Sequence, residues 1–314
     1  MVNQVQYALR DIRDAFFDEL YDIAVKDRSV VFLTADMGAL SLEKFKKNLP
    51  AQYINVGISE QNLVSVAAGL ALAGKKVFIY AIASFITHRC FEQIRIDLCG
   101  MNLPVVIIGS GPGICYGSDG STHHAVEDIA LMRVLPNISI LNPSDPVSAS
   151  AAAGISYQSN VPVYVRLDKG KLPLIYPNTI SFSEGLSLLK KGQDLLIITT
   201  GVMVHNVCAL AQELAKRSID AGILDVYRIK PLNETLLLSY LRTYRTIVTV
   251  EEHSIVGGIG SAICELVADQ GISVNIRRFA IPIKNCEHFG DRQWMHHYYG
   301  LDIQTMADKI FLDN

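Results

Sequence analysis

The sequence has no excess of charge of either sign and no long uncharged apolar run. Its 314 residues carry 28 Lys and Arg against 31 Asp and Glu, for a formal net charge of −3. A dedicated nucleic-acid surface needs a basic excess, so this composition argues against that class of function. No apolar run approaches the ~20 residues that span a bilayer, and the charged N-terminus lacks the core of a signal peptide. The mean hydropathy of +0.26 therefore indicates buried strands and interfaces.

Paired cysteines and several common catalytic signatures are also missing. The six cysteines, Cys286 among them, are scattered, without a C-x-x-C pair or a cysteine–histidine spacing suited to zinc. Scattered thiols are typical of reduced, buried residues, which predicts a cytoplasmic protein. There is no P-loop, H-E-x-x-H or G-x-S-x-G. The glycine-rich run 109–113 lacks the G-x-G-x-x-G spacing, and Pro112 removes an amide donor, so a strand-end loop is favoured over a nucleotide site.

The sequence does contain an alternation of two kinds of apolar segment. Short β-branched runs without polar alternation are typical of strands buried on both faces, as in parallel sheets. Between these runs, apolar residues at three- and four-residue spacing predict helices over about 60–73 and 85–99, ended by Gly74 and Gly100. The strand runs are residues 30–34, 77–83, 105–109 and 138–142. The alternation predicts an α/β protein with parallel sheets.

The pattern is interrupted once, which predicts two domains. Residues 167–185 are rich in proline, glycine and polar residues, and a second strand–helix alternation begins after them. We expect a first α/β domain over residues 1–170, a linker over 171–185 and a second, separate parallel-sheet domain over 186–314.

The first chemically informative segment is YINVGISEQNLVSVAAGLALAG, residues 53–74. Ser59 is a predicted N-cap, and Glu60 opens an apolar helix. The simplest explanation is that an acid in the first turn complements the helix dipole. The residues around Glu60 are apolar, however, so its carboxylate would be poorly solvated and would require one strong partner.

Two further segments place chemistry-bearing side chains after strands. In residues 113–137, glycines and small residues surround Asp119, His123 and His124 ahead of a helix, where open α/β sheets bind ligands. A cap-and-turn structure explains this loop equally well. In residues 80–100, Phe85 and His88 belong to a three-residue repeat that predicts a stripe on one helix face; core packing is the usual reason, and a platform for an aromatic ring is the alternative.

Taken together, these segments resemble the C-terminal half of a transketolase, its pyrimidine-binding domain followed by the family's C-terminal domain. The resemblance covers nearly the whole chain, and the pair G-I-S-E-Q and D-G-S-T-H, in this order, is its most specific part. The β subunits of 2-oxoacid dehydrogenases share the first element, and we do not recognise their pattern in the second. The matching segments are TADM (34–37), NVGISEQNL (55–63), ASFITHRCFEQIR (83–95), GSDGSTHHAVEDIALMRVLPN (117–137) and VEEHSIVGGIG (250–260).

The resemblance implies a thiamine diphosphate site. Glu60 would hydrogen-bond the N1′ atom of the aminopyrimidine and act in catalysis by sharing a proton with that nitrogen. Phe85, or alternatively His88, would stack on the pyrimidine ring. Asp36 would lie close to the cofactor.

It also implies a substrate site. Asp119 and His123 would face the hydroxyl groups of the sugar, with His123 a second catalytic residue because imidazole can orient a hydroxyl or shuttle a proton. Arg13 and Arg166 match positions that bind a substrate phosphate, which a guanidinium can hold bidentately.

Two positions depart from the family pattern. Transketolases commonly carry a histidine where this chain has Gly111 and a serine where it has Leu40, and both belong to the phosphate-binding set. We therefore expect a donor or acceptor that differs from the central pentose phosphates, such as an unusual or nucleotide-linked sugar.

The resemblance also predicts a partner chain. The family holds magnesium and the diphosphate with a Gly-Asp-Gly motif and a downstream asparagine in an N-terminal domain, and this sequence has no Gly-Asp-Gly. We expect an N-terminal transketolase subunit to hold Mg²⁺, with the cofactor between the two chains in an α2β2 assembly, and no metal ligand in this chain.

The preferred hypothesis is thus one subunit of an enzyme that moves a two-carbon ketol unit from a ketose to an aldose. The alternatives are another thiamine reaction, either deoxyxylulose phosphate synthesis or the work of a 2-oxoacid dehydrogenase E1 β-like subunit, and a non-catalytic assembly or regulatory subunit.

Overall fold

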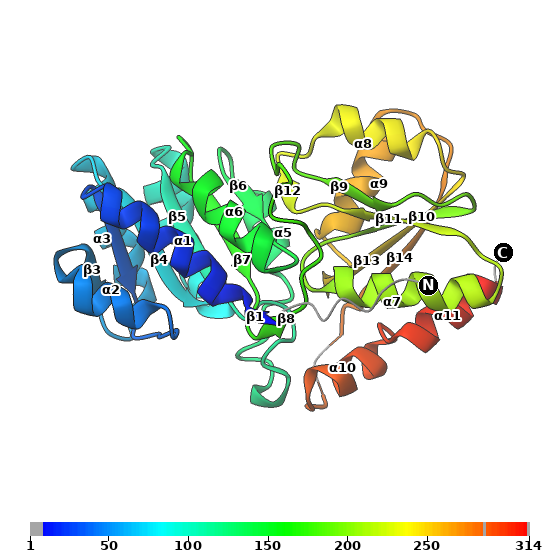
Figure 1. Cartoon of the computed structure of the whole chain (residues 1–314), viewed down its shortest axis with the longest axis horizontal. Helices are drawn as coiled ribbons and strands as arrows, with labels where there is room; N and C mark the ends of the chain where they lie inside the picture. Colours follow the sequence, from blue (N-terminus) through cyan, green and yellow to red (C-terminus); the bar gives the residue numbers. More distant parts are fainter. Residues whose placement is uncertain (1–8, 285–286, 313–314) are drawn as a thin grey trace.

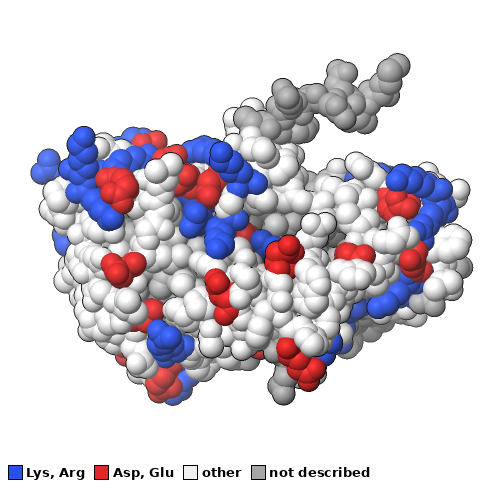
Figure 2. Space-filling model, turned by 90° about the horizontal axis from the view of Figure 1, so that it is seen from below, with Lys and Arg blue, Asp and Glu red and all other residues white. Residues whose placement is uncertain are grey.

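The computed structural model describes residues 9–284 and 287–312, and in it two α/β domains lie side by side (Figure 1). Cys286 lies outside the described residues, and the five described cysteines are free thiols. No helix in the described part of the chain is both long and apolar enough to cross a membrane. On the face shown in Figure 2, basic and acidic residues are interspersed and large areas carry neither.

The first domain is built on a seven-stranded sheet with the order β12-β6-β7-β5-β4-β2-β3. Six of these strands run parallel, and the central ones are buried on both faces, as their β-branched runs predicted. The strands are β2 (Val30–Thr34), β3 (Tyr53–Asn55), β4 (Lys76–Ile82), β5 (Val105–Ser110), β6 (Ser139–Leu141), β7 (Val163–Leu167) and β12 (Arg228–Lys230).

Helices cover both faces of this sheet. On one face α1 and α6 lie together (Figure 1) and pack with α2 over a core that contains Phe17 and Phe32. The opposite face is covered by α3, α5 and the segment after β4. These elements are α1 (Ile12–Lys26), α2 (Leu42–Asn48), η1 (Pro50–Gln52), α3 (Glu60–Leu72), η2 (Phe85–Arg89), α4 (Phe91–Gln93), η3 (Ile94–Gly100), η4 (Gly117–Asp119), α5 (Asp128–Arg133) and α6 (Pro146–Tyr157).

The second domain is built on a five-stranded sheet with the order β14-β13-β10-β11-β9. Its strands are β9 (Ser187–Lys190), β10 (Leu195–Thr199), β11 (Ala221–Asp225), β13 (Thr246–Ser254) and β14 (Asn275–Ile281). Its helices are α7 (Met203–Lys216), α8 (Glu234–Leu241), α9 (Ile259–Asp269), α10 (Arg292–Tyr299) and α11 (Ile303–Leu312). The four strands other than β9 are parallel, and β9 pairs antiparallel with β11.

The structure differs from the sequence predictions in three places. The expected continuous helix over 85–99 is interrupted, because η2 and η3 are π-helical turns on either side of the short α4. The two expected domains also share a sheet, since β12 from the second half of the chain pairs antiparallel with β6 of the first. Finally, Ser59 precedes α3 but does not cap it, because its hydroxyl donates to the carbonyl of Val56.

The parallel strands bring the predicted site residues to one edge. Asp36, Glu60, Phe85 and the loop with Asp119 and His123 follow β2, β3, β4 and β5 in turn. The carboxyl ends of neighbouring parallel strands meet at one edge of a sheet, which is where α/β proteins bind ligands. The short pair β1 (Arg10–Asp11) and β8 (Lys171–Leu172), which follows β7, holds the start of α1 at the same edge.

Candidate active site

Glu60 is a buried acid with an exposed partner. It is the first residue of α3, and only 4% of its surface is exposed. Its Oε2 atom accepts a hydrogen bond of 2.7 Å from Nη1 of Arg89, whose side chain is 47% exposed. A carboxylate at this position was predicted to need one strong partner. The partner is Arg89, which the sequence did not single out.

Phe85 lies between Arg89 and the loop after β5. The Cζ atom of Arg89 lies 4.4 Å from the centroid of the Phe85 ring, a cation–π contact. The His123 ring lies on the loop after β5, with its centroid 5.1 Å from that of Phe85. The geometry therefore brings Glu60, Phe85 and His123 into one chain of contacts through Arg89.

The loop after β5 is tied to the segment after β4. The hydroxyl of Ser84 donates to the carbonyl of Thr122, immediately before His123. Asp119 ends the short turn η4 and is exposed, so it lies on the surface of the loop. Tyr116 packs beside His123 with ring centroids 5.7 Å apart. An acid and an imidazole on one exposed loop are suited to hydrogen bonding with sugar hydroxyls.

His88 and Asp36 lie at the same edge with other partners. Burial by itself lowers the pKa of His88, but the Glu127 carboxylate, 3.3 Å from Nε2, together with Asp128 and the carbonyl of Ser84 outweighs burial, so the pKa is raised. Asp36 is exposed and has a φ of 57°. Its Oδ1 atom accepts from Nδ2 of Asn55 at 2.9 Å, which joins the ends of β2 and β3.

The two arginines expected at a substrate phosphate lie in different surroundings. Arg13 is half-buried in α1, and Asp11 accepts hydrogen bonds from its backbone N–H and its guanidinium. Tyr80 and Tyr116 are close enough to interact electrostatically with the same guanidinium. Arg166 is 3% exposed, and its guanidinium donates to Oδ2 of Asp128 at 2.8 Å.

Arg166 also donates to the carbonyl of Glu252 in the second domain, at 2.9 Å. A guanidinium engaged in this way serves as a clamp between the domains. The arrangement does not support its expected role at a substrate phosphate, which stays a prediction.

Tyr116 explains the glycine at position 111. Gly111 has a φ of 64°, and a Cβ built there would lie 2.2 Å from Cε2 of Tyr116, so the tyrosine ring fills the space of a side chain. Burial raises the pKa of Tyr116 to about 12. The Nζ atom of Lys169 lies 3.5 Å from the centroid of the same ring. Leu40, the other departure from the family pattern, is 81% exposed.

Arg89, Tyr116 and Lys169 are the residues of this edge that the sequence reasoning missed. For Arg89 a signal existed, because it follows Phe85 by four residues, a spacing that places a cation near an aromatic ring on a helix. Tyr116 and Lys169 come from different loops, and nothing in their local sequence indicates that they meet.

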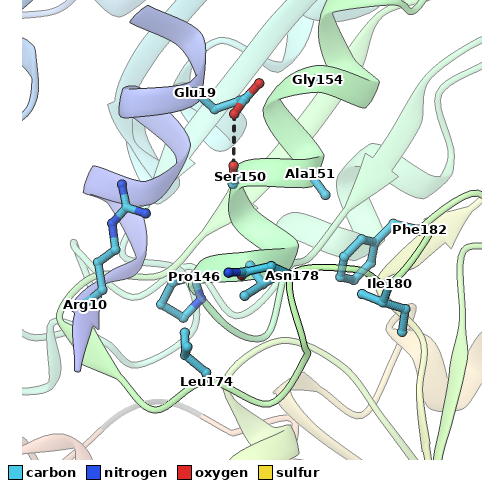
Figure 3. Close-up of a pocket in the computed structure, with 11 residues that line it drawn as sticks. Arg10, Glu19, Pro146, Ser150, Ala151, Gly154, Leu174, Asn178, Ile180 and Phe182 are labelled. Atoms are coloured by element: carbon cyan, nitrogen blue, oxygen red, sulfur yellow. Dashed lines mark hydrogen bonds between the residues drawn. The ribbon is translucent and has the colours of Figure 1, made fainter. Parts of the chain in front are cut away.

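One cavity lies apart from the predicted site residues. This cavity, of about 480 Å³, lies between α1, α6 and the linker. Arg10, Asn178 and Phe182 are among the residues that line it (Figure 3), and none of the predicted site residues does. At its side, Ser150 donates to Glu19 at 3.2 Å. Among the described residues, no three His, Cys, Asp or Glu side chains are grouped so that they could hold a metal ion.

The residues at the edge fit the cofactor that the resemblance implies. An aminopyrimidine offers a flat aromatic ring and nitrogen atoms for hydrogen bonding. Glu60 supplies a buried carboxylate whose present donor comes from an exposed side chain, and Phe85 supplies a half-buried ring that contacts the same guanidinium. A carboxylate that accepts a hydrogen bond and an aromatic face that stacks are the two kinds of contact that such a ring requires.

Comparisons with known proteins identify the family of the chain. The family model described as the transketolase pyrimidine binding domain matches residues 9–174, and that of the transketolase C-terminal domain matches residues 185–306. A subunit of the apulose-4-phosphate transketolase of Phocaeicola vulgatus is 36% identical over 298 residues, 94% of this chain and 95% of that protein.

Two further matches are similar in extent. The 6-deoxy-6-sulfo-D-fructose transketolase subunit SqwH of a Clostridium species is 35% identical over 282 residues, covering 89% of this chain and 86% of that protein. A solved structure described as a split gene transketolase, inactive beta4 tetramer, has a TM-score of 0.85 at 31% identity, over 95% of this chain and 96% of that one. The fold and these matches show that the chain belongs to the transketolase family of thiamine diphosphate-dependent transferases, as a pyrimidine-binding domain followed by a C-terminal domain.

Proposed function

We propose that this chain is the C-terminal subunit of a two-subunit transketolase that transfers a two-carbon ketol unit from a ketose to an aldose. The observation that carries the proposal is Glu60, a carboxylate with only 4% of its surface exposed, at the start of α3 and at the ligand-binding edge of the sheet. Burying a charge is costly unless it is paired, so a fold keeps such an acid where it has a function or a fixed partner. Here the partner is an exposed side chain that can leave.

The chain's own residues have distinct tasks in this proposal. Glu60 holds and returns a proton at a pyrimidine nitrogen, and Phe85, with His88 at the rim, packs against the ring. Asp36 helps to shape the cofactor side of the edge through its bond to Asn55. When bound, thiamine diphosphate supplies the carbanion chemistry that breaks and forms the carbon–carbon bond.

The substrate side is assigned to the loop after β5 and to Arg13. Asp119 and His123 hydrogen-bond the sugar hydroxyls, and His123 exchanges a proton with one of them. Arg13 binds an anionic group of the sugar. Closure of the edge by a second chain excludes water, which strengthens each of these contacts.

A second chain is required for the diphosphate and Mg²⁺. The proposal rests on the missing Gly-Asp-Gly motif and on exposed apolar residues next to the site, since Leu40 is 81% and Ile58 78% exposed. Large exposed apolar side chains beside a binding edge are typical of a surface that another protein covers. The relatives named above are likewise described as subunits of transketolases. We propose an α2β2 assembly.

We further propose a sugar that differs from the central pentose phosphates. Tyr116 fills the space beside Gly111, and Leu40 replaces a hydroxyl donor, so two of the four expected phosphate ligands are absent. The two relatives are named for an apulose phosphate and a sulfonated deoxyfructose, which supports an unusual sugar for this chain too.

Reconstitution tests the proposed function. The chain is purified with the product of a neighbouring gene that carries Gly-Asp-Gly and a downstream asparagine, and thiamine diphosphate and Mg²⁺ are added. We expect two-carbon transfer only with both chains present, and low efficiency with xylulose 5-phosphate plus ribose 5-phosphate. Decarboxylation of pyruvate by the complex would favour one of the other thiamine reactions, and no turnover with any ketose or 2-oxoacid would favour an assembly role.

A further inference from the structure

One guanidinium occupies both groups that the proposed function gives to the pyrimidine ring. Arg89 donates to the Glu60 carboxylate at 2.7 Å, and its Cζ atom lies 4.4 Å from the centroid of the Phe85 ring. A guanidinium is planar, carries N–H donors at its edge and stacks on aromatic faces. It therefore resembles a protonated aminopyrimidine in the two properties that Glu60 and Phe85 recognise.

The two partners of this ion pair differ in their access to water. Glu60 is 4% exposed and would be costly to leave unpaired, whereas 47% of the Arg89 side chain is exposed. Release of the guanidinium therefore places its charge in solvent and leaves no unpaired cation behind. The Glu60 carboxylate, in contrast, can lose this donor cheaply only if another donor replaces it.

Only the side chain of Arg89 has to move in such an exchange. Its backbone carbonyl accepts a hydrogen bond of 3.2 Å from Nε2 of Gln61, the second residue of α3. This bond holds the end of the π-turn η2 against the helix that carries Glu60. The site can therefore exchange one planar donor for another without a rearrangement of its backbone.

We infer that Arg89 is a placeholder residue that competes with the cofactor's pyrimidine for Glu60 and Phe85. In the chain without cofactor, Arg89 satisfies the buried acid and covers the aromatic ring, which keeps the site folded. Binding of the cofactor displaces the guanidinium, so the ion pair lowers the affinity by the free energy of breaking it. This inference rests on the proposed function.

Arg89→Ala is expected to raise the affinity for the cofactor and to lower the Tm of the chain without cofactor. In the two-subunit protein, equilibrium dialysis with thiamine diphosphate and Mg²⁺ is expected to show binding that is about twofold to fivefold tighter than in the wild type, the equivalent of one partly exposed ion pair. In the chain without partner or cofactor, the same variant leaves Glu60 without its donor and lowers Tm by roughly 2–4 °C. A residue with only a structural role would weaken both properties.

Arg95→Ala is the matched control. Arg95 lies on the same stretch of chain, its side chain is 48% exposed, and it pairs with Glu92 at 2.9 Å. Neither measurement is expected to change in this variant. Arg89→Lys keeps the charge without the planar fork, so it should retain most of the Tm and give an intermediate affinity. If Arg89→Ala does not fold, Arg89→Lys is used for both measurements.

The outcomes separate the inference from the proposed function. If the wild-type pair of subunits binds no thiamine diphosphate, the proposed function fails. If the wild type binds and Arg89→Ala binds equally or more weakly, Arg89 is not a placeholder and the inference is overturned. Tighter binding in Arg89→Ala together with unchanged binding in Arg95→Ala supports it.

Discussion

Asp168 and Arg292 join the two domains through two parallel hydrogen bonds. Asp168 directly follows β7 of the first sheet, and Arg292 is the first residue of α10. Nη1 of Arg292 donates to Oδ1 of Asp168 at 2.9 Å, and Nη2 donates to Oδ2 at 2.6 Å. Arg292 also donates to both carboxylate oxygens of Glu252 at 2.8 Å. A single guanidinium thus hydrogen-bonds two buried acids at the domain boundary, and the ring of His296 also contacts Glu252.

Arg292→Met is therefore expected to be strongly destabilising. It leaves the Asp168 carboxylate, which is 5% exposed, without its cation, and leaves the Glu252 carboxylate, which is 1% exposed, with only the ring of His296 as a basic partner. Removal of one partner from a buried ion pair costs about 3–5 kcal/mol, measured as the free energy of unfolding in urea. The control is Arg95→Met, which breaks an exposed pair and should cost no more than about 1 kcal/mol. Equal losses of unfolding free energy in the two variants would mean that the buried ion pairs of Arg292 stabilise the fold no more than an exposed pair does.

Asp225 makes stability depend on pH. It is fully buried at the end of β11, where Oδ2 accepts from the hydroxyls of Ser144 and Tyr176 at 2.7 and 2.8 Å. Burial raises its pKa from 3.8 to about 7. Because the folded state binds this proton more tightly than the unfolded state, the contribution to stability is full below about pH 4 and is lost as the pH rises through 7.

Asp225→Asn removes this titration. The difference in unfolding free energy between the variant and the wild type should shift in favour of the variant from pH 5 to pH 8, by on the order of 2–4 kcal/mol. Urea unfolding at several pH values measures the difference. Asp220→Asn is the control, because Asp220 is exposed with a lowered pKa and so keeps its charge throughout this range. A constant difference between Asp225→Asn and the wild type would contradict the assignment.

Much of the fold follows from local sequence, and the exceptions have identifiable causes. The buried runs around β2, β4 and β5 have no polar alternation, which only strands covered on both faces tolerate, so the parallel sheet was predictable. The strand β12 was not, because its place at the edge of the first sheet depends on a contact with β6, some 90 residues away in the chain. The π-turns η2 and η3 were missed because three- and four-residue spacing does not distinguish them from an α-helix.

The candidate site shows a similar division. Glu60, Phe85, Asp119 and His123 follow successive strands, so their meeting at one edge follows from the parallel arrangement alone. The ion pair of Glu60 with Arg89 could not be predicted, since it requires the exact register of two helices that the sequence leaves open. Their roles toward cofactor and substrate stay predictions that rest on the resemblance.

Gly111→Ala tests the link between Gly111 and Tyr116. At a φ of 64° an alanine is strained by about 1–2 kcal/mol, and its Cβ would lie 2.2 Å from the tyrosine ring. We expect a loss of unfolding free energy above the strain alone, and a changed KM for the sugar. Adding Tyr116→Ala should recover the part of the unfolding free energy that is lost through the clash with the ring, and the part lost through backbone strain should remain. Gly38→Ala, with nothing within 4 Å of the built Cβ, should change neither property. A double variant as unstable as Gly111→Ala would show that the ring is not the obstacle.

Substitutions of Glu60 and of His123 are expected to impair different steps of the reaction. In the two-subunit enzyme, Glu60→Ala or Glu60→Gln should reduce turnover by at least ~10²-fold, the lower range for a positioned proton-transfer group. His123→Ala should impair kcat/KM for the sugar while thiamine diphosphate binding, measured by dialysis, stays near the wild-type value. Glu92→Gln alters an exposed acid that pairs with Arg95 and should leave both measurements unchanged. Near-normal turnover of Glu60→Ala with the partner present would remove the basis of the proposed chemistry, because the burial of this acid beside an exposed, releasable partner is the observation on which that chemistry depends.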